Sequence, residues 1–516
     1  MSEFGFWKAA ARNPDHLALA EVGGRTLKAG ELAAEANRLT HALRKLGLQP
    51  GDAVATCLPS GVEMIEAYLA AFQGGFYLVP INHHLVAAEI AYILSDCEAK
   101  AFLGHERFAA ACRAAADEAG VPAGGRLAVG KIAGFTALAD AMAGCSSALP
   151  ENRTAGQVMN YTSGTTGRPK GVRRALPPVD PDLMGSLYAL FLTMFGIQGD
   201  DDNVHLCGSP LYHTAVLMFV TCSLHFGHGV VLMDKWTPEE CLAAIEKYRV
   251  TTSHMVPTQF HRLLALPEAT KKKYDLSSLR AMVHAAAPCP VDVKKRMIEW
   301  WGPTIYEYYA ASEGGGTVVS PAEWMKYPGT VGKAWPSSDI KIYDDDGNEM
   351  PPDKPGTVYM LLGQNDFKYH KDDKKTEANR RGSYFTVGDI GYLNAEGYLF
   401  LCDRKADMII SGGVNIYPAE IESVLMMHPK VADAAVFGIP NEDWGEEVKA
   451  VIEVADGAVA GDALAKEILD FCDDKLAKYK RPKSIDFINA MPRDPNGKLY
   501  KRKLRDPYWV GRDRAI

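Results

Sequence analysis

Hydrophobic and polar residues alternate with two different periods along the first hundred residues. From Glu31 to Leu46 apolar side chains recur at the three- to four-residue spacing of a helix, and residues 52–58 form a short apolar run after a Pro-Gly turn, as a buried strand does. The alternation continues with helical patterns at 62–72 and 85–94 and strand-like runs at 76–81 and 99–103. Such alternation is typical of an α/β sheet with helices on its faces.

A second block of the same kind lies further along the chain. It predicts strands at 204–209 and 229–233 and helices at 216–226 and 238–248. Between the two blocks, residues 114–156 are rich in Ala, Gly, Ser and Pro and predict a loosely structured connection that could contain a helix. We therefore expect a second α/β layer after this connection.

The pattern changes between Thr330 and Asp403, where short strand-like runs are separated by Asp-Asp-Asp-Gly, Lys-Pro-Gly and Ala-Glu-Gly turns. We expect a small β-rich subdomain there, with no helix of any length. From residue 404 onward both periods return, with helical patterns at 419–427 and 461–476 and a strand-like run at 432–438. A second domain is therefore expected at 404–516, which leaves residues 1–403 to the first.

Composition narrows the class of protein. The 516 residues are 47% hydrophobic and 23% charged, as in an ordinary soluble globular protein, and the net charge of −8 gives no sign of a basic face for nucleic acid. No apolar run approaches the length of a membrane span, and the N-terminus does not read as a signal peptide. The ten cysteines have no paired or metal-like spacing, so free thiols are expected and structural zinc is not. These features predict a cytoplasmic enzyme.

One loop carries the strongest chemical signal. Residues 161–172 read Tyr-Thr-Ser-Gly-Thr-Thr-Gly-Arg-Pro-Lys-Gly-Val. Glycines let backbone N–H groups turn toward an anion, hydroxyls add donors, and the lysine adds a mobile positive charge. The spacing is not that of a Walker A loop, so a nucleotide-phosphate site of another kind is predicted, with a Ser/Thr-rich surface loop as the alternative. The candidate phosphate-binding residues are Thr162, Ser163, Gly164, Thr165, Thr166, Gly167 and Lys170.

Three further segments carry groups that a nucleotide needs. Residues 306–316 combine tyrosines, which can stack on a base, with Glu313, a carboxylate suited to a divalent cation. Asp389 follows a short strand and a glycine, where its oxygens could accept from ribose hydroxyls, and Arg404 comes fifteen residues later. Lys498 lies in a Pro/Gly turn near the C-terminus. Taken singly, each of these residues also fits a core aromatic or a surface charge.

Together these segments resemble the adenylate-forming superfamily of acyl-CoA synthetases, acyl-adenylating domains of peptide synthetases and firefly luciferase, and most of all a bacterial fatty-acyl-CoA ligase. The resemblance spans nearly the whole chain. It implies an α/β fold with a large N-terminal AMP-binding domain of stacked α/β layers plus a β-rich subdomain, at 1–403, and a smaller mobile α+β C-terminal domain, at 404–516. The six motifs that carry it, in the family's order, are 161–172, 309–313, 386–389, 403–407, 412–421 and 492–498.

The resemblance also implies the reaction of an acid–thiol ligase that uses ATP, CoA and Mg²⁺. A carboxylic acid and ATP give acyl-AMP and pyrophosphate, and CoA then takes the acyl group and releases AMP. The loop at 162–170 would hold the β and γ phosphates, Glu313 the Mg²⁺ and Ser312 the α-phosphate. Lys498 would bridge the substrate carboxylate and the α-phosphate. Adenine would contact Tyr309, Ala285, Ala286 and Ala287, and ribose would contact Asp389 and Arg404.

Rotation of the C-terminal domain is implied for the second half-reaction. It would withdraw Lys498 and present Gly412, Gly413 and Asn415 to the pantetheine arm of CoA. The hinge position is Ala406, where the family usually has Asp or Lys, and Ala310 replaces a glycine beside the substrate carboxylate. These two substitutions bear on the domain rotation and on the shape of the acyl pocket.

The acid is the least defined part of the prediction. His213, in Pro-Leu-Tyr-His, matches the segment that lines the family's acyl channel and is a candidate catalytic residue that gates it, or else a core histidine. Apolar neighbours and the three glycines 314–316 favour a medium- or long-chain fatty acid or a cyclic or steroid side-chain acid, and an aromatic acid stays open. The competing hypotheses are an enzyme that passes the acyl group to a carrier protein or to oxygen, and an inactive acyl- or nucleotide-binding protein. Peripheral membrane contact stays open, as does the choice between monomer and homodimer.

Overall fold

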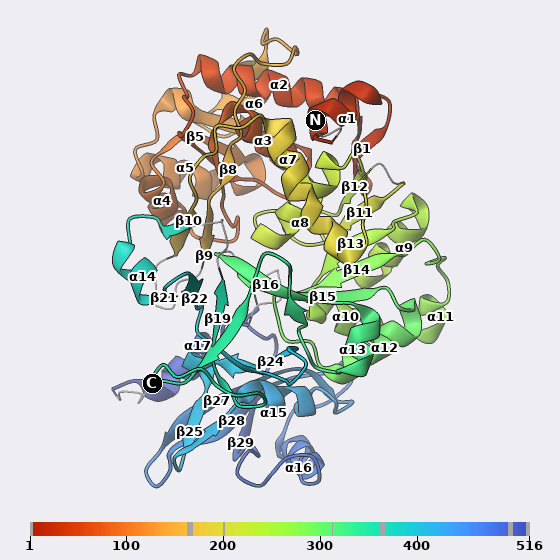
Figure 1. The fold of residues 1–516 in the computed structure, drawn as a ribbon, viewed down its shortest axis with the longest axis vertical. Coiled ribbons are helices and arrows are strands. Elements are labelled where there is room, and N and C mark those ends of the chain that lie inside the picture. Colours follow the sequence, from red (N-terminus) through yellow and green to blue (C-terminus); the bar gives the residue numbers. More distant parts are fainter. Residues whose placement is uncertain are drawn as a thin grey trace. The chain divides into compact units, whose positions relative to one another are not determined.

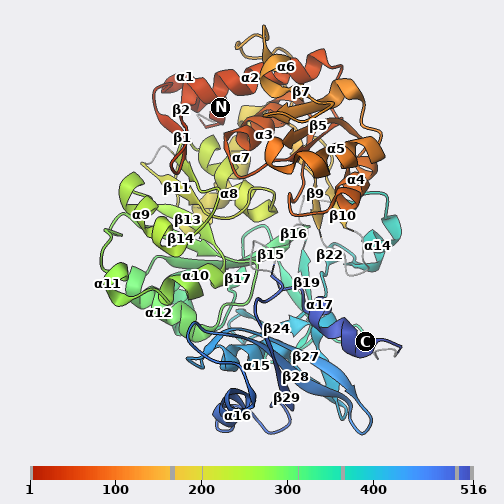
Figure 2. The same ribbon diagram turned by 180° about the vertical axis from the view of Figure 1, so that it is seen from behind.

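Two units of secondary structure are built from interleaved stretches of the chain. The computed structural model describes residues 4–162, 169–199, 202–311, 313–361, 367–493 and 499–511. The first unit comprises residues 1–255, 266–283 and 364–378, and the second comprises residues 256–265, 284–363 and 379–516. Figures 1 and 2 show the elements of each unit from opposite sides. The boundary expected at 403/404 stays a prediction.

The first unit contains a six-stranded sheet in which every pairing is parallel. Its strands, in spatial order, are β7 (Thr136–Ala137), β6 (Arg126–Val129), β5 (Ala99–His105), β3 (Ala53–Cys57), β4 (Tyr77–Pro80) and β8 (Gln157–Val158). The helices among these strands are α2 (Ala29–Lys45), α3 (Val62–Gly74), α4 (Ala87–Asp96), α5 (Ala109–Glu118) and α6 (Leu138–Met142). The alternation of strand and helix predicted for this region is confirmed.

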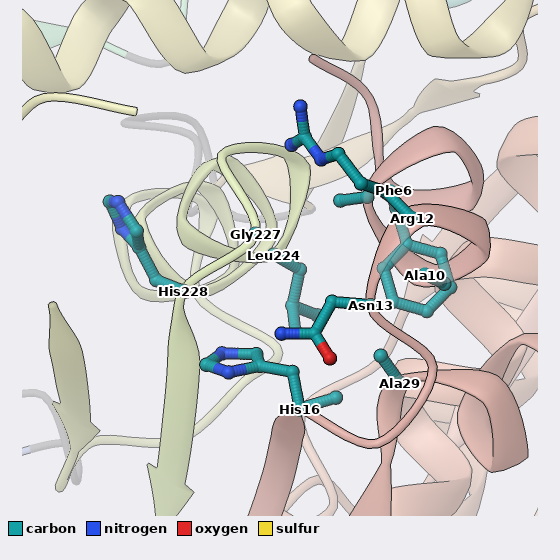
Figure 3. Close-up of a pocket in the computed structure, with 11 residues that line it drawn as sticks. Phe6, Ala10, Arg12, Asn13, His16, Ala29, Leu224, Gly227 and His228 are labelled. Atoms are coloured by element: carbon teal, nitrogen blue, oxygen red, sulfur yellow. The ribbon is translucent and has the colours of Figure 1, made fainter. Parts of the chain in front are cut away.

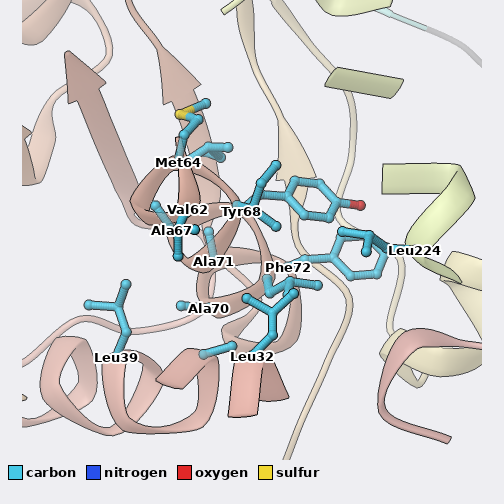
Figure 4. Packing of buried hydrophobic residues seen from close by; sticks show 14 of the residues in the cluster. Leu32, Leu39, Val62, Met64, Ala67, Tyr68, Ala70, Ala71, Phe72 and Leu224 are labelled. Atoms are coloured by element: carbon cyan, nitrogen blue, oxygen red, sulfur yellow. The ribbon is translucent and has the colours of Figure 1, made fainter. Parts of the chain in front are cut away.

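Both faces of this sheet are covered, and the strand residues divide between two cores by alternation. Val54 of β3 packs with α2 and α3, whereas its neighbours Ala53 and Ala55 pack with α4 and α5 on the other face. Figure 4 shows the first of these cores, with side chains of α2, α3 and Leu224 directed toward one another. Strands buried on both faces read as continuous apolar runs, which is why the sequence pattern located them.

A second sheet contributes six mostly parallel strands to the first unit. These strands, in order, are β14 (Ala281–His284, with its last residue in the second unit), β13 (Thr252–Met255), β11 (Val204–Cys207), β12 (Gly229–Leu232), β1 (Leu17–Glu21) and β2 (Thr26–Lys28). The pairs β1–β12, β11–β12 and β11–β13 are parallel, and the pair β1–β2 is antiparallel. The accompanying helices are α1 (Phe6–Arg12), α7 (Pro181–Ala189), α8 (Thr214–His225), α9 (Pro238–Tyr248) and α11 (Glu268–Lys271).

Two predictions about connections need correction. The stretch 114–156, expected to be a loose connection that could contain a helix, contains the helix α6 but also the strand β6, which pairs with β5 and β7 in the parallel sheet. The stretch 330–403, expected to lack helices, contains the six-residue helix α14 (Asp373–Ala378). This helix follows β20 (Lys368–Tyr369), which pairs with β10 (Lys170–Arg173) of the first unit.

Antiparallel pairing dominates the second unit. The strands β15 (Ile305–Ala311), β16 (Gly314–Val319) and β17 (Lys333–Ala334) form one antiparallel set. A second set consists of β18 (Ile340–Tyr343), β19 (Gly356–Leu361), β21 (Arg380–Arg381), β22 (Tyr384–Phe385), β23 (Asp389–Leu393) and β24 (Leu399–Arg404). The helices α10 (Pro257–Leu264), α12 (Val291–Trp301) and α13 (Pro321–Lys326) belong to this unit as well. The expected β-rich part is therefore present.

The C-terminal stretch of the second unit has a core of its own, built from α15, α16 and the strands between and around them. Its sheet has the order β26-β25-β28-β27, and β29 adds to β28 in parallel. The bounds are β25 (Ile409–Ser411), β26 (Val414–Ile416), α15 (Pro418–Leu425), β27 (Val431–Asn441), β28 (Gly445–Val454), α16 (Asp462–Phe471), β29 (Ser484–Ile488) and α17 (Lys501–Arg505). The predicted α+β character of this stretch is confirmed.

Acid is expected to destabilise the first unit through His225, which is fully buried. Its Nδ1 accepts from the backbone N–H of Phe6 at 3.3 Å, and its Nε2 lies 3.2 Å from the Tyr68 hydroxyl. Burial, with the charge of Arg153, lowers the pKa of His225 to about 3, below its ordinary value of 6.5. The unfolded chain therefore binds the extra proton first, and stability is lost as the pH falls below 6.5.

We expect this single histidine to remove about 2 kcal/mol of unfolding free energy between about pH 7 and pH 5. Urea unfolding at both pH values checks it, with His225→Gln as the control because glutamine can donate and accept but does not titrate in this range. Equal pH dependence in wild type and variant would contradict the assignment.

The residues that line a small pocket of the first unit include none of the predicted site residues. It is lined by α1, by the chain around His16 and by the end of α8, with a volume of about 180 Å³ (Figure 3). That is below the roughly 300 Å³ at which drug-sized ligand pockets begin. All ten cysteines are free thiols. In the described part of the chain, no helix is both long enough and apolar enough to cross a bilayer.

Candidate active site

Tyr309, Asp389 and Arg404, which are far apart in sequence, meet in the second unit. Tyr309 lies on β15, Asp389 begins β23, and Arg404 ends β24 as the cross-strand partner of Asp389. The hydroxyl of Tyr309 donates to Oδ2 of Asp389 at 2.6 Å, and Nε of Arg404 lies 3.5 Å from Oδ1. Asp389 is only 9% exposed. One carboxylate oxygen thus accepts a hydrogen bond, and the other faces a guanidinium group.

The protonation of this group follows from its surroundings. Burial, and then the charge and hydrogen bond of Asp389, hold the pKa of Tyr309 well above its ordinary value, and the carboxylate of Glu313 acts in the same direction. Tyr309 therefore stays a hydrogen-bond donor at neutral pH. Its ring is held by its own hydroxyl, which leaves a fixed aromatic surface beside a carboxylate acceptor.

The Ala285–Ala287 segment makes a strained turn directly after β14. Ala286 has φ of 73°, in the left-handed region that non-glycine residues seldom adopt. Ala285 is buried and Ala286 is exposed. Strain of this kind gathers at ligand sites. This segment was predicted as an adenine contact, and its role stays a prediction.

Glu313 lies between β15 and β16 and is only 5% exposed, and Ser312 lies outside the described residues. The glycines that follow it have a backbone role. Gly314, Gly315 and Gly316 have φ of 130°, 66° and 158°, and a Cβ on Gly316 would lie 2.4 Å from the carbonyl oxygen of Tyr309. This close approach gives Gly316 a backbone reason to be glycine, and the prediction that the three glycines make room for a bulky acid stays a prediction.

The strands that flank the predicted phosphate loop form a hairpin in the first unit. Thr162 ends β9 (Asn160–Thr162) and is the cross-strand partner of Lys170, which begins β10. Nζ of Lys170 lies 3.1 Å from Oδ2 of Asp372. An anion bound at this lysine would compete with that carboxylate. The predicted residues Ser163, Gly164, Thr165, Thr166 and Gly167 lie outside the described residues, as does Lys498.

Gly412 and Gly413 form the two-residue turn of the β25–β26 hairpin. Their φ angles of 58° and 77° are those of a type I′ turn, and Ser411 pairs with Val414 across it. A Cβ on Gly412 would lie 2.6 Å from the ring of Trp444, whereas a Cβ on Gly413 would meet open space. Asn415 lies on β26, opposite Ile410. The positive φ angles of this turn therefore account for both glycines without any contact to a ligand.

His213 occupies the N-cap position of α8 and is half-buried. Its ring centroid lies 4.5 Å from that of Tyr212, and Tyr212 in turn lies 5.3 Å from His83. Burial lowers the pKa of His83 to about 4. The three rings form an aromatic group in the first unit, and the predicted gating role of His213 stays a prediction.

A buried ionic group at His284, Lys294 and Glu307 is a feature that sequence reasoning missed. Nζ of Lys294 lies 2.6 Å from Oε2 of Glu307, and Nε2 of His284 lies 3.3 Å from the same oxygen. A signal was present, because Lys294 shares one face of α12 with the buried residues Met297 and Trp301. A lysine on an apolar helix face indicates a buried partner.

Known proteins share both the sequence and the fold. The AMP-binding enzyme family model matches residues 6–364, and the model of the AMP-binding enzyme C-terminal domain matches residues 420–498. The fatty acid–acyl-carrier-protein ligase ScoC of Streptomyces coeruleorubidus is 31% identical, over 96% of this chain and 94% of that protein. A feruloyl-CoA synthase of Amycolatopsis sp. is 32% identical, over 97% of this chain and 98% of that protein.

The structure agrees with these sequence matches. ATP-bound MatB from Rhodopseudomonas palustris is 29% identical and superposes with a TM-score of 0.80, over 96% of each chain. The fold is the α/β fold of adenylate-forming enzymes, with a large N-terminal domain and a smaller C-terminal domain. By sequence and by fold, the chain belongs to the AMP-binding enzyme family and carries that family's C-terminal domain.

Proposed function

We propose that this protein is an ATP-dependent acyl-CoA ligase. In the first step an oxygen of the substrate carboxylate attacks the α-phosphorus of ATP, and the bond to pyrophosphate breaks. In the second step the thiolate of CoA attacks the acyl carbonyl carbon, and AMP leaves with its electron pair. Carboxylate and phosphate are both negative, so positioning and fixed donors are what the protein has to supply.

The arrangement of Tyr309, Asp389 and Arg404 is the observation that carries the proposal. A nucleoside presents an aromatic face and vicinal hydroxyls. The second unit offers a tyrosine ring for the first and a nearly buried carboxylate for the second, and the tyrosine hydroxyl donates to that carboxylate at 2.6 Å. The second carboxylate oxygen faces Arg404 at 3.5 Å. These groups would bind adenine and ribose and orient the α-phosphate for attack.

Phosphate and metal binding are assigned to separate groups. Thr162, Lys170 and the residues between them would bind the β and γ phosphates, and Ser312 would contact the α-phosphate. Glu313 fits Mg²⁺, because it is a hard oxygen donor and Mg²⁺ is usually held by one or two carboxylates together with substrate phosphates. When bound, Mg²⁺ would offset the charge of the phosphate oxygens. Lys498 would neutralise charge between the carboxylate and the α-phosphate.

We propose an apolar acid as substrate, with His213 at the acyl pocket. The apolar helix α8 that follows His213 favours such an acid. Among the relatives, ScoC is named for a fatty acid and the feruloyl-CoA synthase for an aromatic acid. ScoC is also named for transfer to a carrier protein, which makes carrier loading the second candidate function.

A thioester assay distinguishes the two candidates. The enzyme is incubated with ATP, Mg²⁺ and a panel of fatty, aromatic and steroid side-chain acids, with either CoA or a phosphopantetheinylated carrier protein. We expect acyl-CoA and AMP in equal amounts with at least one apolar acid, and none without ATP. Acylation of the carrier alone would overturn the CoA assignment, and the absence of pyrophosphate exchange with every acid would indicate an inactive binding protein.

The turn at Gly413 is expected to matter for the second step only. Asparagine tolerates a positive φ, so Gly413→Asn keeps the type I′ turn while a side chain projects into the open space there. If CoA passes beside this turn, kcat/KM for CoA falls about tenfold while pyrophosphate exchange is unchanged. Gly457→Asn is the matched control, because Gly457 also has positive φ, of 83°, and open space around it. Wild-type CoA kinetics in Gly413→Asn would restrict this glycine to its backbone role.

A further inference from the structure

The buried group at His284, Lys294 and Glu307 is a cluster of titratable side chains that the proposed reaction does not use directly. Lys294 and His284 are fully buried, and Glu307 is 6% exposed. Both nitrogens approach one atom, Oε2 of Glu307, at 2.6 Å and 3.3 Å. On its other side, Nζ of Lys294 lies 4.7 Å from the ring centroid of Trp324, on α13. Four elements therefore converge on a single ion pair.

The carboxylate of Glu307 is ionised at neutral pH. Burial alone would raise the pKa of Glu307, but the neighbouring Lys294 and His284 lower it to about 2. Burial lowers the pKa of His284 below its ordinary value. Removing such charges from water is costly, and an apolar cluster of equal volume often stabilises a fold as well or better. Stability alone therefore does not explain why this position holds charged residues.

The positions of His284 and Glu307 in the chain suggest a role in the nucleotide site. His284 ends β14, and the next residue is Ala285, the start of the strained turn. Glu307 precedes Tyr309 by two residues on β15, and residues two apart on a strand point to the same face. The contact of His284 with Glu307 thus joins the end of β14 to the face of β15 that carries Tyr309, and Lys294 of α12 holds Glu307 from the same side of its carboxylate. It ties together the two segments predicted to flank adenine.

We propose that Lys294, Glu307 and His284 are positioning residues that set the separation between the Ala285–Ala287 turn and the ring of Tyr309, and so the affinity for the adenine nucleotide. This inference rests on the proposed function, because it concerns the nucleotide site of the same enzyme. The group touches no substrate atom. Its effect is exerted through Tyr309 on one side and through the backbone after His284 on the other.

Substitution of both charges at once is the appropriate test. Lys294→Met alone would leave an unpaired buried carboxylate and risks unfolding, whereas Lys294→Met with Glu307→Gln removes both charges and keeps volume and a hydrogen-bonding group near His284. We expect the double variant to fold, with KM for ATP and the calorimetric Kd for AMP raised about tenfold and with KM for CoA within about twofold of wild type. The single variant Lys294→Arg keeps the charge, so its affinity for AMP should lie between those of the wild type and the double variant.

A second double variant controls for the loss of any buried ion pair. Arg153 and Asp182 are 8% and 4% exposed and pair at 3.0 Å in the first unit. Arg153→Met with Asp182→Asn should lower the unfolding midpoint without changing the Kd for AMP. If the Lys294/Glu307 double variant folds and binds AMP within twofold of wild type, or if the KM values for ATP, acid and CoA all rise together, the positioning role is refuted. Wild-type protein that binds no AMP would instead refute the proposed function.

Discussion

Replacing Lys498 with alanine is expected to slow adenylation by about 10² to 10³-fold, comparable to the loss of one preorganised oxyanion donor. The same variant should convert supplied acyl-adenylate and CoA to thioester at close to the wild-type rate. The reason is that charge accumulates between carboxylate and α-phosphate only in the first step, where the lysine is assigned by family resemblance. Pyrophosphate exchange measures the first step, and thioester formation from synthetic acyl-adenylate measures the second.

Lys503→Ala is the matched control for this prediction. Lys503 lies on α17, five residues beyond Lys498, and its side chain is exposed. Its replacement removes one positive charge from the same segment and should leave both rates unchanged. Equal loss of both half-reactions in Lys498→Ala would contradict a division of labour between two positions of the C-terminal domain, since a lysine withdrawn from the site cannot affect the second step.

Replacing Asp389 with alanine is expected to reduce kcat/KM for ATP by about 10²-fold, mostly through KM. The carboxylate that would accept from the two ribose hydroxyls is removed, at about 1.5 kcal/mol for each charged hydrogen bond. The Tyr309 hydroxyl would also be left without its buried acceptor. Steady-state kinetics at saturating acid and CoA measure the effect.

Two milder variants separate the parts of that loss. Tyr309→Phe keeps the aromatic face and removes only the donor to Asp389, so a drop of about tenfold is expected. Asp389→Asn keeps an acceptor for Tyr309 and removes the charge that faces Arg404, which should give an intermediate effect. An unchanged KM for ATP in Asp389→Ala would show that the nucleoside binds elsewhere.

The pairing of Asp389 with Arg404 could be predicted from local sequence. The Ala-Glu-Gly turn at residues 395–397 lies midway between them, so a hairpin closed by that turn brings them to within one residue of each other, and a β-bulge between Ile390 and Gly391 places them directly opposite. Helix α9 was equally predictable, because Thr237 caps it and Pro238 opens it. In both cases the decisive interactions are close in sequence.

Long-range contacts are what the sequence pattern could not supply. The strand β6 has only four residues in an Ala- and Gly-rich stretch, and it forms because β5 offers a parallel edge. The pairing of β20 with β10 joins segments nearly two hundred residues apart. The ion pair of Lys294 and Glu307 was hidden for a related reason, since a lysine on a helix normally faces solvent and its partner lies on another element.

Glycines in this chain have backbone functions that the sequence alone does not reveal. Gly314 to Gly316 have positive φ angles, and Gly316 lies close to the Tyr309 carbonyl, while the room that they are predicted to leave for a bulky acid stays a prediction. The Gly412-Gly413 turn is a similar case. A glycine in a motif specifies a backbone conformation first, and a ligand contact needs a separate observation.

Transfer of ¹⁸O from the acid tests the central claim most directly. The enzyme is supplied with an accepted acid labelled in both carboxylate oxygens, together with unlabelled ATP and CoA, and the products are analysed by mass spectrometry. Attack of the carboxylate on the α-phosphorus predicts that AMP gains one labelled oxygen and that the acyl-CoA retains the other. Unlabelled AMP, or label in released inorganic phosphate together with ADP, would contradict an adenylate-forming ligase.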